Sequence, residues 1–498
     1  MYKGTNPPSL ASTIYMKRRR TWFRSKRPAK RVKLHRDTQD SNEGVGLQNL
    51  PNEVLAEIFR WAVEDDTLFL PHLKPITDSY FPRTVLHIRI AHVCSQWRKL
   101  AIATIWNRVY LDLGRMFQHC FPPPHEEVWN HFISLLPPQQ GLDIHITALK
   151  WIAPGALQSI VLDHAARIKS LHLEIDDDDM KVLLHLPPNT FPILRHLSLV
   201  YLMAPYFRVF PPDGADFTPI SQLAPRLMSF GFFSIYTRHI EPRRFGLDLC
   251  SLTKLNLSTG VTEDIIYDVL HLTPSIQSLA AWITKSRSPN TISTSDDSEE
   301  SDEDEEDEDT IESIATSDAE NVPAIILHHL TDLNLGFGSA GVQARFMREV
   351  GTPSLAALSL QPNVSYTEAL HKVTLQFLRR STTTRPHGLT SLVLHGVKGL
   401  SEAQFRELLT EHGTDLTELC IDSCSGSLWD VFNEESEFQK SSPTTEAPNT
   451  PPLLLPNLAA FTCIGFEKDR ARGIVDFIDG RNSKNGNTKE GTGFAECI

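Results

Sequence analysis

The residues that could ligate a metal are few and stand alone in the sequence. Cys420 and Cys424 are separated by three residues, and His328 and His329 are adjacent, so either pair could supply two ligands. Zinc sites take three or four such ligands, and no second CxxC-type pair accompanies these residues. We therefore expect no metal site, and we interpret the two histidines as surface residues at the entrance of a strand.

The motifs of common catalytic sites are also missing from the sequence. It contains no Gly-rich phosphate-binding loop, no HExxH pair and no GxSxG turn. Cys94 is interpreted as a small apolar residue, because the sequence supports no histidine placed to activate its thiol. We expect the chain to be no enzyme and to use no cofactor.

Length and composition favour a large intracellular protein. The 498 residues are enough for two to four domains, and the formal charge of -13 argues against a wholly basic nucleic-acid binder. No apolar run is long enough to cross a bilayer, and no secretory signal is visible at the start. Seven scattered cysteines suit a reducing compartment. We expect no membrane partner.

Charge is concentrated in two opposed runs. Residues 17–36 carry eleven Lys or Arg and no acid, and residues 296–309 carry twelve Asp or Glu and no base. The basic run includes PAKRVKL, which closely resembles nuclear-import signals, so we expect a nuclear protein with an importin as partner and the cytoplasm as a second location. The residues that carry this expectation are Lys17, Arg18, Arg19, Arg20, Lys30, Arg31 and Lys33. A solvated tail and a mitochondrial transit peptide are the alternatives, although Pro28 disfavours the amphipathic helix of the latter.

Residues 47–113 show helical periodicity in two stretches. The first, LQNLPNEVLAEIFRWAVEDD, places Pro51 at the first helical position and repeats apolar residues as one wide stripe. That stripe contains Val54, Leu55, Ile58, Phe59 and Ala62. The second stretch follows an insertion near residues 65–85, and its predicted single face contains Ile90, Val93, Cys94, Trp97, Ala101 and Ile105.

The succession LPNEVLAEIF, HVCSQWRKLA and IWNRVYLDL resembles the F-box, a helical module that docks on the Skp-type adaptor of cullin-RING ubiquitin ligases. The long insertion resembles the arrangement common in fungal F-box proteins. The family often has a Pro before the late Trp, where this chain has Thr104, Ile105 and Trp106, so the last helix is expected to be shifted or shortened. By motif position, the resemblance implies adaptor contacts at Leu50, Pro51, Ile58, Phe59, Val93, Cys94 and Trp97. Some of these must pack the module's own core, and the alternative is that the whole stripe is internal.

From residue 168 onward the pattern Φ-x-x-Φ-x-Φ returns ten times. Most steps between copies are 24 to 34 residues, which fits or slightly exceeds a leucine-rich repeat. Its last two apolar positions are expected to point inward from a short strand. Stretches such as residues 261–274 and 401–413 read as the helices between strands. The copies are Ile168/Leu171/Leu173, Leu194/Leu197/Leu199, Leu227/Phe230/Phe232, Leu252/Leu255/Leu257, Ile276/Leu279/Ala281, Leu330/Leu333/Leu335, Leu355/Leu358/Leu360, Leu389/Leu392/Leu394, Leu416/Leu419/Ile421 and Leu458/Phe461/Cys463.

We therefore predict an α/β protein, in which a small all-α F-box-like module precedes an irregular leucine-rich-repeat horseshoe. A disordered basic arm should occupy residues 1–46, the repeats residues 114–470, and a tail residues 471–498, which is Gly-, Asn- and Lys-rich from Arg481 and expected to be disordered there. Disordered insertions are expected near 286–322 and 434–452, since these runs are too charged or too polar to order themselves. An ordinary α/β domain with Leu-rich strands is the alternative.

These parts together predict a substrate-recognition subunit of a Skp-cullin-F-box ubiquitin ligase. Its partners would be the Skp-type adaptor, the cullin scaffold and an unknown target protein held by the repeats. Its mechanism would be proximity, because holding a target near a separate transfer enzyme raises their effective concentration. The alternative is a nuclear scaffold or chromatin-associated protein that binds nucleic acid through its basic arm.

Overall fold

The fold is seen in a computed structural model, and all the residues it describes belong to the compact unit Glu43–Ile498. The described residues are 50–62, 68–69, 90–106, 108–112, 125–147, 157–201, 209–210, 218–234, 239–285, 323–362, 365–382, 388–422, 431–432, 455–464 and 494–497.

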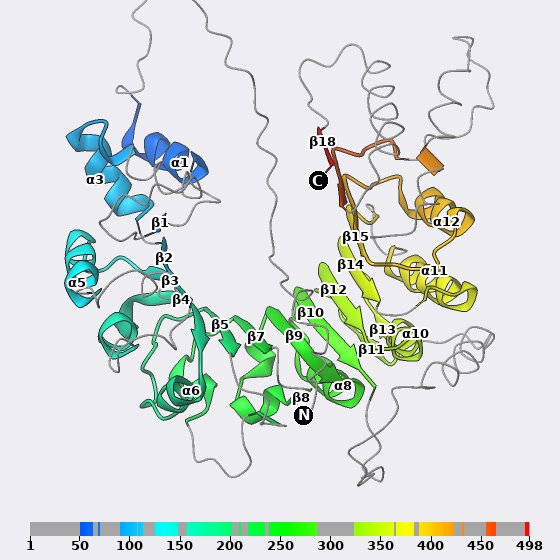
Figure 1. The fold of residues 1–498 in the computed structure, drawn as a ribbon, viewed down its shortest axis with the longest axis horizontal. Coiled ribbons are helices and arrows are strands. Elements are labelled where there is room, and N and C mark those ends of the chain that lie inside the picture. Colours follow the sequence, from blue (N-terminus) through cyan, green and yellow to red (C-terminus); the bar gives the residue numbers. More distant parts are fainter. Residues whose placement is uncertain are drawn as a thin grey trace, which may run out of the picture. The chain divides into compact units, whose positions relative to one another are not determined.

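One large sheet organises this unit. It has 14 strands, all parallel, and their order in the sheet follows their order in the chain (Figure 1). The strands are β1 (Leu68–Phe69), β2 (Arg108–Asp112), β3 (Leu142–Thr147), β4 (Ile168–Ile175), β5 (His196–Tyr201), β7 (Ser229–Ser234), β9 (Lys254–Thr262), β10 (Ser278–Thr284), β12 (Asp332–Phe337), β14 (Ala357–Pro362), β15 (Ser391–His395), β16 (Glu418–Asp422), β17 (Ala460–Ile464) and β18 (Phe494–Cys497). Two short pairs lie apart from it, β6 (Val209–Phe210) with β8 (His239–Ile240) and β11 (Ile325–Ile326) with β13 (Val350–Gly351).

The repeated apolar pattern is what holds neighbouring strands in register. Each of its ten copies supplies one strand, and the middle residues of successive copies pair directly, as Leu171 does with Leu197 and Leu333 with Leu358. All ten middle residues are buried, so the predicted inward direction of the pattern is confirmed. Because strands lie about 4.8 Å apart, this register stacks the leucines into a continuous core.

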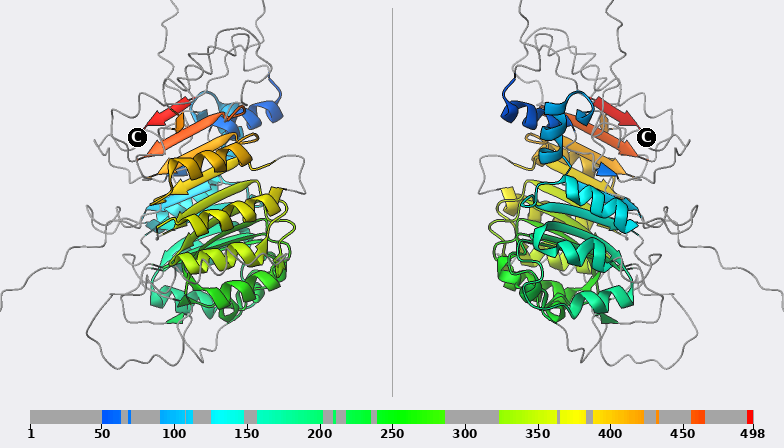
Figure 2. Two further views of the ribbon diagram at one scale, coloured as in Figure 1. Left: turned by 90° about the vertical axis from the view of Figure 1, so that its right-hand side faces the viewer. Right: turned by 90° about the vertical axis from the view of Figure 1, so that its left-hand side faces the viewer.

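Helices connect the strands on one side of the sheet. Figure 1 shows α10 (Ala340–Glu349), α11 (Glu368–Thr382) and α12 (Glu402–His412) side by side, and Figure 2 shows them stacked in the same order. The predicted helices at 261–274 and 401–413 are confirmed as α8 (Glu263–Leu272) and α12. Ser401 caps α12, since its hydroxyl accepts from the Gln404 amide while the Gln404 side chain accepts from the Ser401 amide.

The remaining connections are shorter or less regular. They are the α-helices α5 (His125–Leu135), α6 (Asp177–Leu184) and α7 (Ile220–Leu223), the π-helical turn η4 (Leu157–Val161), and the 3-10 turns η5 (Leu162–Arg167), η6 (Pro242–Phe245) and η7 (Leu249–Ser251). Unequal connections of this kind agree with the unequal steps between the sequence repeats.

The strands that flank each predicted insertion pair directly with each other. Strand β10 bonds to β12 in unbroken register from Ser278 with Asp332 to Ile283 with Phe337, and β16 bonds to β17 in the same way. Residues 286–322 and 434–452 themselves lie outside the described residues. An insertion between paired strands costs little, because loop-closure entropy grows only slowly with length.

The prediction that the N-terminal module is all-α is wrong. Its helices are α1 (Asn52–Ala62) and α3 (Ser95–Thr104), but β1 and β2 also fall within residues 47–113 and begin the large sheet. The segment IWNRVYLDL, expected as a last helix, supplies β2. The alternating sequence of Arg108–Asp112 suits an extended strand, and β3 offers it a partner edge.

The C-terminal tail also differs from the expectation of disorder at its end. Phe494–Cys497 forms β18, which pairs in parallel with β17. An edge strand presents unpaired N–H and C=O groups, so a short segment can add to it with little sequence preference.

Candidate functional site

The N-terminal ends of α1 and α3 lie together. The side-chain amide of Gln96 donates to Asn52 Oδ1 at 2.9 Å, which ties the first turns of the two helices. Pro51 stands just before α1, not within it as predicted, because its carbonyl accepts the first helical bond from the Leu55 amide at 3.0 Å. Cys94 caps α3, and its Sγ accepts from the Trp97 amide at 3.4 Å.

A small apolar core lies between these helices. Leu55 and Phe59 of α1 and Ala101 of α3 are at most 1% exposed. The Trp97 ring meets the Phe59 ring edge to face, with 4.8 Å between centroids. The core cluster around them consists of Phe59, Ile90, Ala91, Ala101 and Ile105.

The other side of α1 exposes large apolar side chains. Val54, Ile58 and Trp61 are 44%, 41% and 75% exposed, and their i, i+4, i+7 spacing places them in one line along the helix. Val93, in the turn before α3, is 60% exposed. We call these four residues the apolar stripe. Exposed apolar residues gathered on one element favour burial against another protein.

The predicted site residues separate into three groups. Pro51, Ile58, Val93 and Cys94 are exposed, Leu50 and Trp97 are partly buried, and Phe59 is enclosed in the core. The structure therefore brings most of the predicted contacts to one end of the helix pair and gives Phe59 to internal packing. This agrees with the expectation that some motif positions would serve the module's own core.

Two of the sequence interpretations of this region need correction. The wide α1 stripe divides into a buried side with Leu55 and Phe59 and an exposed side with Val54 and Ile58. The predicted single face of the second stretch is broken, because the chain turns at residues 92–94 and exposes Val93. The prediction also omitted Trp61 from the contacts, although its spacing from Val54 and Ile58 was a readable signal.

The geometry of this region agrees with a family comparison. Residues 47–112 match the F-box-like family. No curated protein matches the chain. The F-box-like domain contains α1, α3, β1 and β2, so the apolar stripe belongs to it entirely.

Helix α3 is attached to the rest of the unit through side chains at its C-terminal end. The Gln140 side-chain amide donates to the carbonyls of Ala103 at 3.0 Å and Ile102 at 3.5 Å, in the last turn of α3. Arg167 in turn donates to the Gln140 carbonyl at 3.2 Å. Trp106 packs against both the small core and the core of the sheet, with its ring stacked 6.3 Å from that of Phe132.

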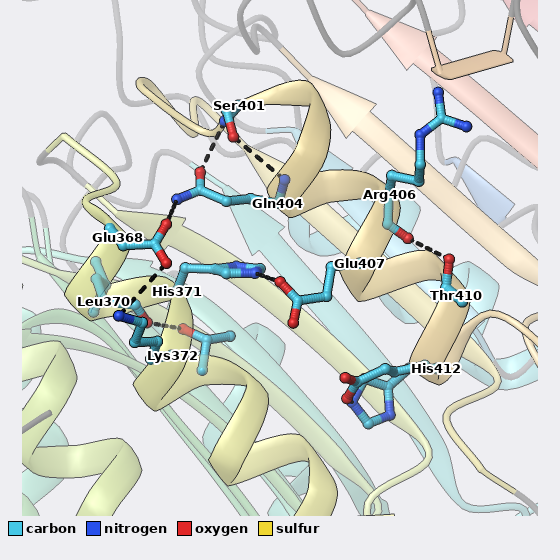
Figure 3. Close-up of polar contacts among 12 residues, drawn as sticks. Glu368, Leu370, His371, Lys372, Ser401, Gln404, Arg406, Glu407, Thr410 and His412 are labelled. Atoms are coloured by element: carbon cyan, nitrogen blue, oxygen red, sulfur yellow. Dashed lines mark hydrogen bonds and ion pairs between the residues drawn. The ribbon is translucent and has the colours of Figure 1, made fainter.

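A second polar cluster lies between α11 and α12 (Figure 3). His371 Nε2 contacts Glu407 Oε2 at 2.9 Å, and the Gln404 amide donates to Glu368 Oε2 at 2.7 Å. A histidine oriented by a carboxylate can serve as a general base, but His371 is only 1% exposed and its Nδ1 is buried. A substrate therefore has no access to this ring, and we interpret the cluster as helix packing.

The histidines and the described cysteine that were considered as metal ligands lie among the repeats. His328 and His329 are exposed just before β12, and Cys420 lies partly buried on β16, while Cys424 is outside the described residues. Within the described ranges no three His, Cys, Asp or Glu side chains gather as metal ligands would, and no described helix is long and apolar enough to cross a membrane. The nuclear-import residues between 17 and 33 also lie outside the described part of the chain.

Proposed function

We propose that the protein is the substrate-recognition subunit of a Skp-cullin-F-box ubiquitin ligase. The observation that carries the proposal is the match of residues 47–112 to the F-box-like family, together with the apolar stripe exposed on the same domain. F-box domains generally bind Skp-type adaptors, and the stripe offers such a partner apolar surface to cover.

The repeats would bind the target protein. On this proposal the repeats are an irregular leucine-rich-repeat horseshoe that holds a target protein for ubiquitin transfer by a separate enzyme, and the parallel strands with their connecting helices support it. The chain itself performs no chemistry on this proposal. On this proposal the insertion near residues 65–85 is of the fungal type, and the basic run at 17–36 directs the complex to the nucleus.

Adaptor capture tests the proposal directly. The full chain and its triple variant V54A/I58A/W61A are each mixed with a purified Skp-type adaptor, and the affinity is measured. Covering the exposed part of Val54 or Ile58 is worth about 1 kcal/mol, and Trp61 offers about 150 Å² more. We expect the variant to bind at least about 100-fold more weakly.

A matched control separates this effect from general surface change. Val182, Met228 and Ile326 are 48%, 40% and 45% exposed and lie outside the F-box-like domain, so V182A/M228A/I326A should bind the adaptor like wild type. Equal binding by the α1 variant and wild type, or no binding by wild type, would refute the proposed function.

A further inference from the structure

One face of the large sheet is left uncovered by the described helices. Along β10 the side chains alternate, so that Leu279 and Ile283 are buried while Ser278 and Trp282 lie on the opposite face. The same alternation runs through the paired strands, because they share one register. We call this opposite side the open face, and Figure 1 shows α8, α10, α11 and α12 on the other side.

Trp282 lies flat against the open face. Its register partner on β12 is Gly336, and a Cβ built there would stand 2.0 Å from Trp282 Cε3 and 2.5 Å from Cζ3. Only glycine lets the ring approach the backbone this closely. Strand β9 bulges beside it, since Leu257 pairs with Ala281 but Gly260 pairs with Trp282. Bulges of this kind re-aim side chains and recur beside functional sites.

Amide side chains occupy neighbouring positions of the open face. Asn256 on β9 and Asn334 on β12 both pair with the small Ala280, which lies two positions before Trp282 on β10. Gln361 is the register partner of Gly336 on β14, and its Oε1 is shielded from solvent with no hydrogen-bond partner in the described structure. A buried acceptor without a donor is costly, and an incoming charged donor relieves that cost most.

The charge of the open face favours a basic partner from β12 to β16. At the positions of this face that the structure describes on β12, β14, β15 and β16, the acidic and basic side chains are Asp332, His395, Glu418 and Asp422, with no Lys or Arg. His395 Nδ1 lies 3.2 Å from Asp422 Oδ2, so these two side chains are partners. Asp332 and Glu418 are exposed, and each accepts a hydrogen bond from a neighbouring hydroxyl, of Thr331 at 2.7 Å and of Ser391 at 3.1 Å respectively.

The earlier strands are different. His145 and His172 lie on β3 and β4 with 3.8 Å between ring centroids, and burial lowers the pKa of His145 to about 3 and of His172 to about 4. Both rings are therefore neutral at pH 7. Lys254 on β9 adds a positive charge to the same face. Asp143 on β3 and Glu174 on β4 also lie on this face, so the earlier strands mix acids, histidines and a lysine, whereas the part from β12 to β16 combines three acids with no Lys or Arg.

We propose that the open face from Trp282 to Asp422 binds an extended basic segment of a partner protein. Trp282 stacks on one Lys or Arg side chain, and the acids of β12 and β16 attract others. Strands β10 and β16 are four strand spacings apart, or about 19 Å, which an extended segment of about six residues spans. The inference rests on the proposed function only in treating this partner as the ligase target.

Photo-crosslinking to the full chain tests the inference. A short Arg/Lys-rich peptide carrying a photo-reactive group is titrated against wild type, and crosslinked residues are mapped by mass spectrometry. We expect crosslinks on β10, β12, β14 and β16. The variant D332N/E418Q should weaken binding about fivefold and W282A about threefold. The same peptide with Gln in place of Arg and Lys should not bind.

Control variants make the result specific. D178N/E402Q removes two acids from helices α6 and α12 and should bind the peptide like wild type. Crosslinks confined to the acidic run 296–309, or an unchanged affinity in D332N/E418Q, would overturn the proposal. A third outcome would also overturn it: a full-length variant with Gln at the basic positions of 17–33 binds the peptide at least tenfold more tightly than wild type. The open face of wild type would then be occupied by the chain's own basic arm. Adaptor binding is unaffected by these outcomes, so failure here is distinct from failure of the proposed function.

Discussion

Replacing Gly336 by Ala tests whether Trp282 really lies on the sheet. The new Cβ would stand 2.0 Å from the nearest ring carbon, whereas ordinary contact is about 3.4 Å or more, so the ring must move by more than about 1 Å. The backbone at Gly336 has no left-handed φ, so the substitution brings no backbone strain of its own. The conflict is between the Cβ and the ring alone.

Two opposing terms set the size of the effect. Forcing extra volume into a packed site costs about 1–3 kcal/mol, and replacing Gly by Ala returns about 0.4–1 kcal/mol by restricting the unfolded chain. We expect G336A to lower the free energy of unfolding by about 1–2 kcal/mol. In the W282A background the ring is gone, and the same substitution should be neutral or stabilising by about 0.5 kcal/mol. The coupling energy between the two sites is then about 2 kcal/mol.

Denaturant unfolding of the four proteins in this cycle measures that coupling, with far-UV circular dichroism as the signal. G338A is the matched control, because a Cβ at Gly338 meets its nearest neighbour, Thr284 Cγ2, at an ordinary 3.4 Å. It should not destabilise the protein. If G336A lowers the free energy of unfolding equally with and without Trp282, the ring does not lie on β12. The proposed stacking of a Lys or Arg side chain on Trp282 would then lose its basis.

Two further predictions concern buried charge. Glu263 of α8 accepts two hydrogen bonds from the Arg345 guanidinium of α10, both at 2.7 Å, and the two side chains are 11% and 29% exposed. E263Q should therefore lower the free energy of unfolding, measured with denaturant, by about 2 kcal/mol. The control E402Q breaks the more exposed pair with Arg406 and should lower it by less than about 0.5 kcal/mol. Burial, with Asp176 and Asp178 nearby, raises the pKa of Asp179 to about 6, so the folded protein loses stability as the pH rises from about 4 to 6. Because this carboxyl is half exposed and screened by solvent, D179N should stabilise the protein by only about 1 kcal/mol at pH 7 and by nothing at pH 4. An equal gain in stability at both pH values would contradict the raised pKa.

The strands of the sheet were predictable because their signal is local and repeated. Each copy of the pattern places its apolar residues two apart, and residues such as Leu255 and Leu392 are buried as that spacing requires. Helix α12 was predictable for the same reason, since its cap and its apolar period both lie within residues 401–413. Strands β1 and β2 were not predicted, because Arg108–Asp112 becomes a strand where β3 supplies the neighbouring edge, and Leu68–Phe69 then pairs with β2.

The candidate site was predicted in its location but not in its orientation. The motif placed Ile58 and Phe59 together as contacts, yet adjacent helical positions point about 100° apart, and only the position of α3 decides which one is covered. The open face around Trp282 gave no sequence signal, since it depends on Gly336, which is 54 residues away in the chain and pairs with it across the insertion.

Because β10 bonds to β12 in unbroken register, cutting the backbone within 286–322 should leave two fragments with matching edges. Six residue pairs and the Glu263–Arg345 ion pair join them across this seam. Each fragment keeps its own repeats, so co-expression of the two pieces should restore one protein by complementation. The seam also accepts a fluorescent reporter in place of the acidic run, which would allow the chain to be tracked without touching the apolar stripe or the open face.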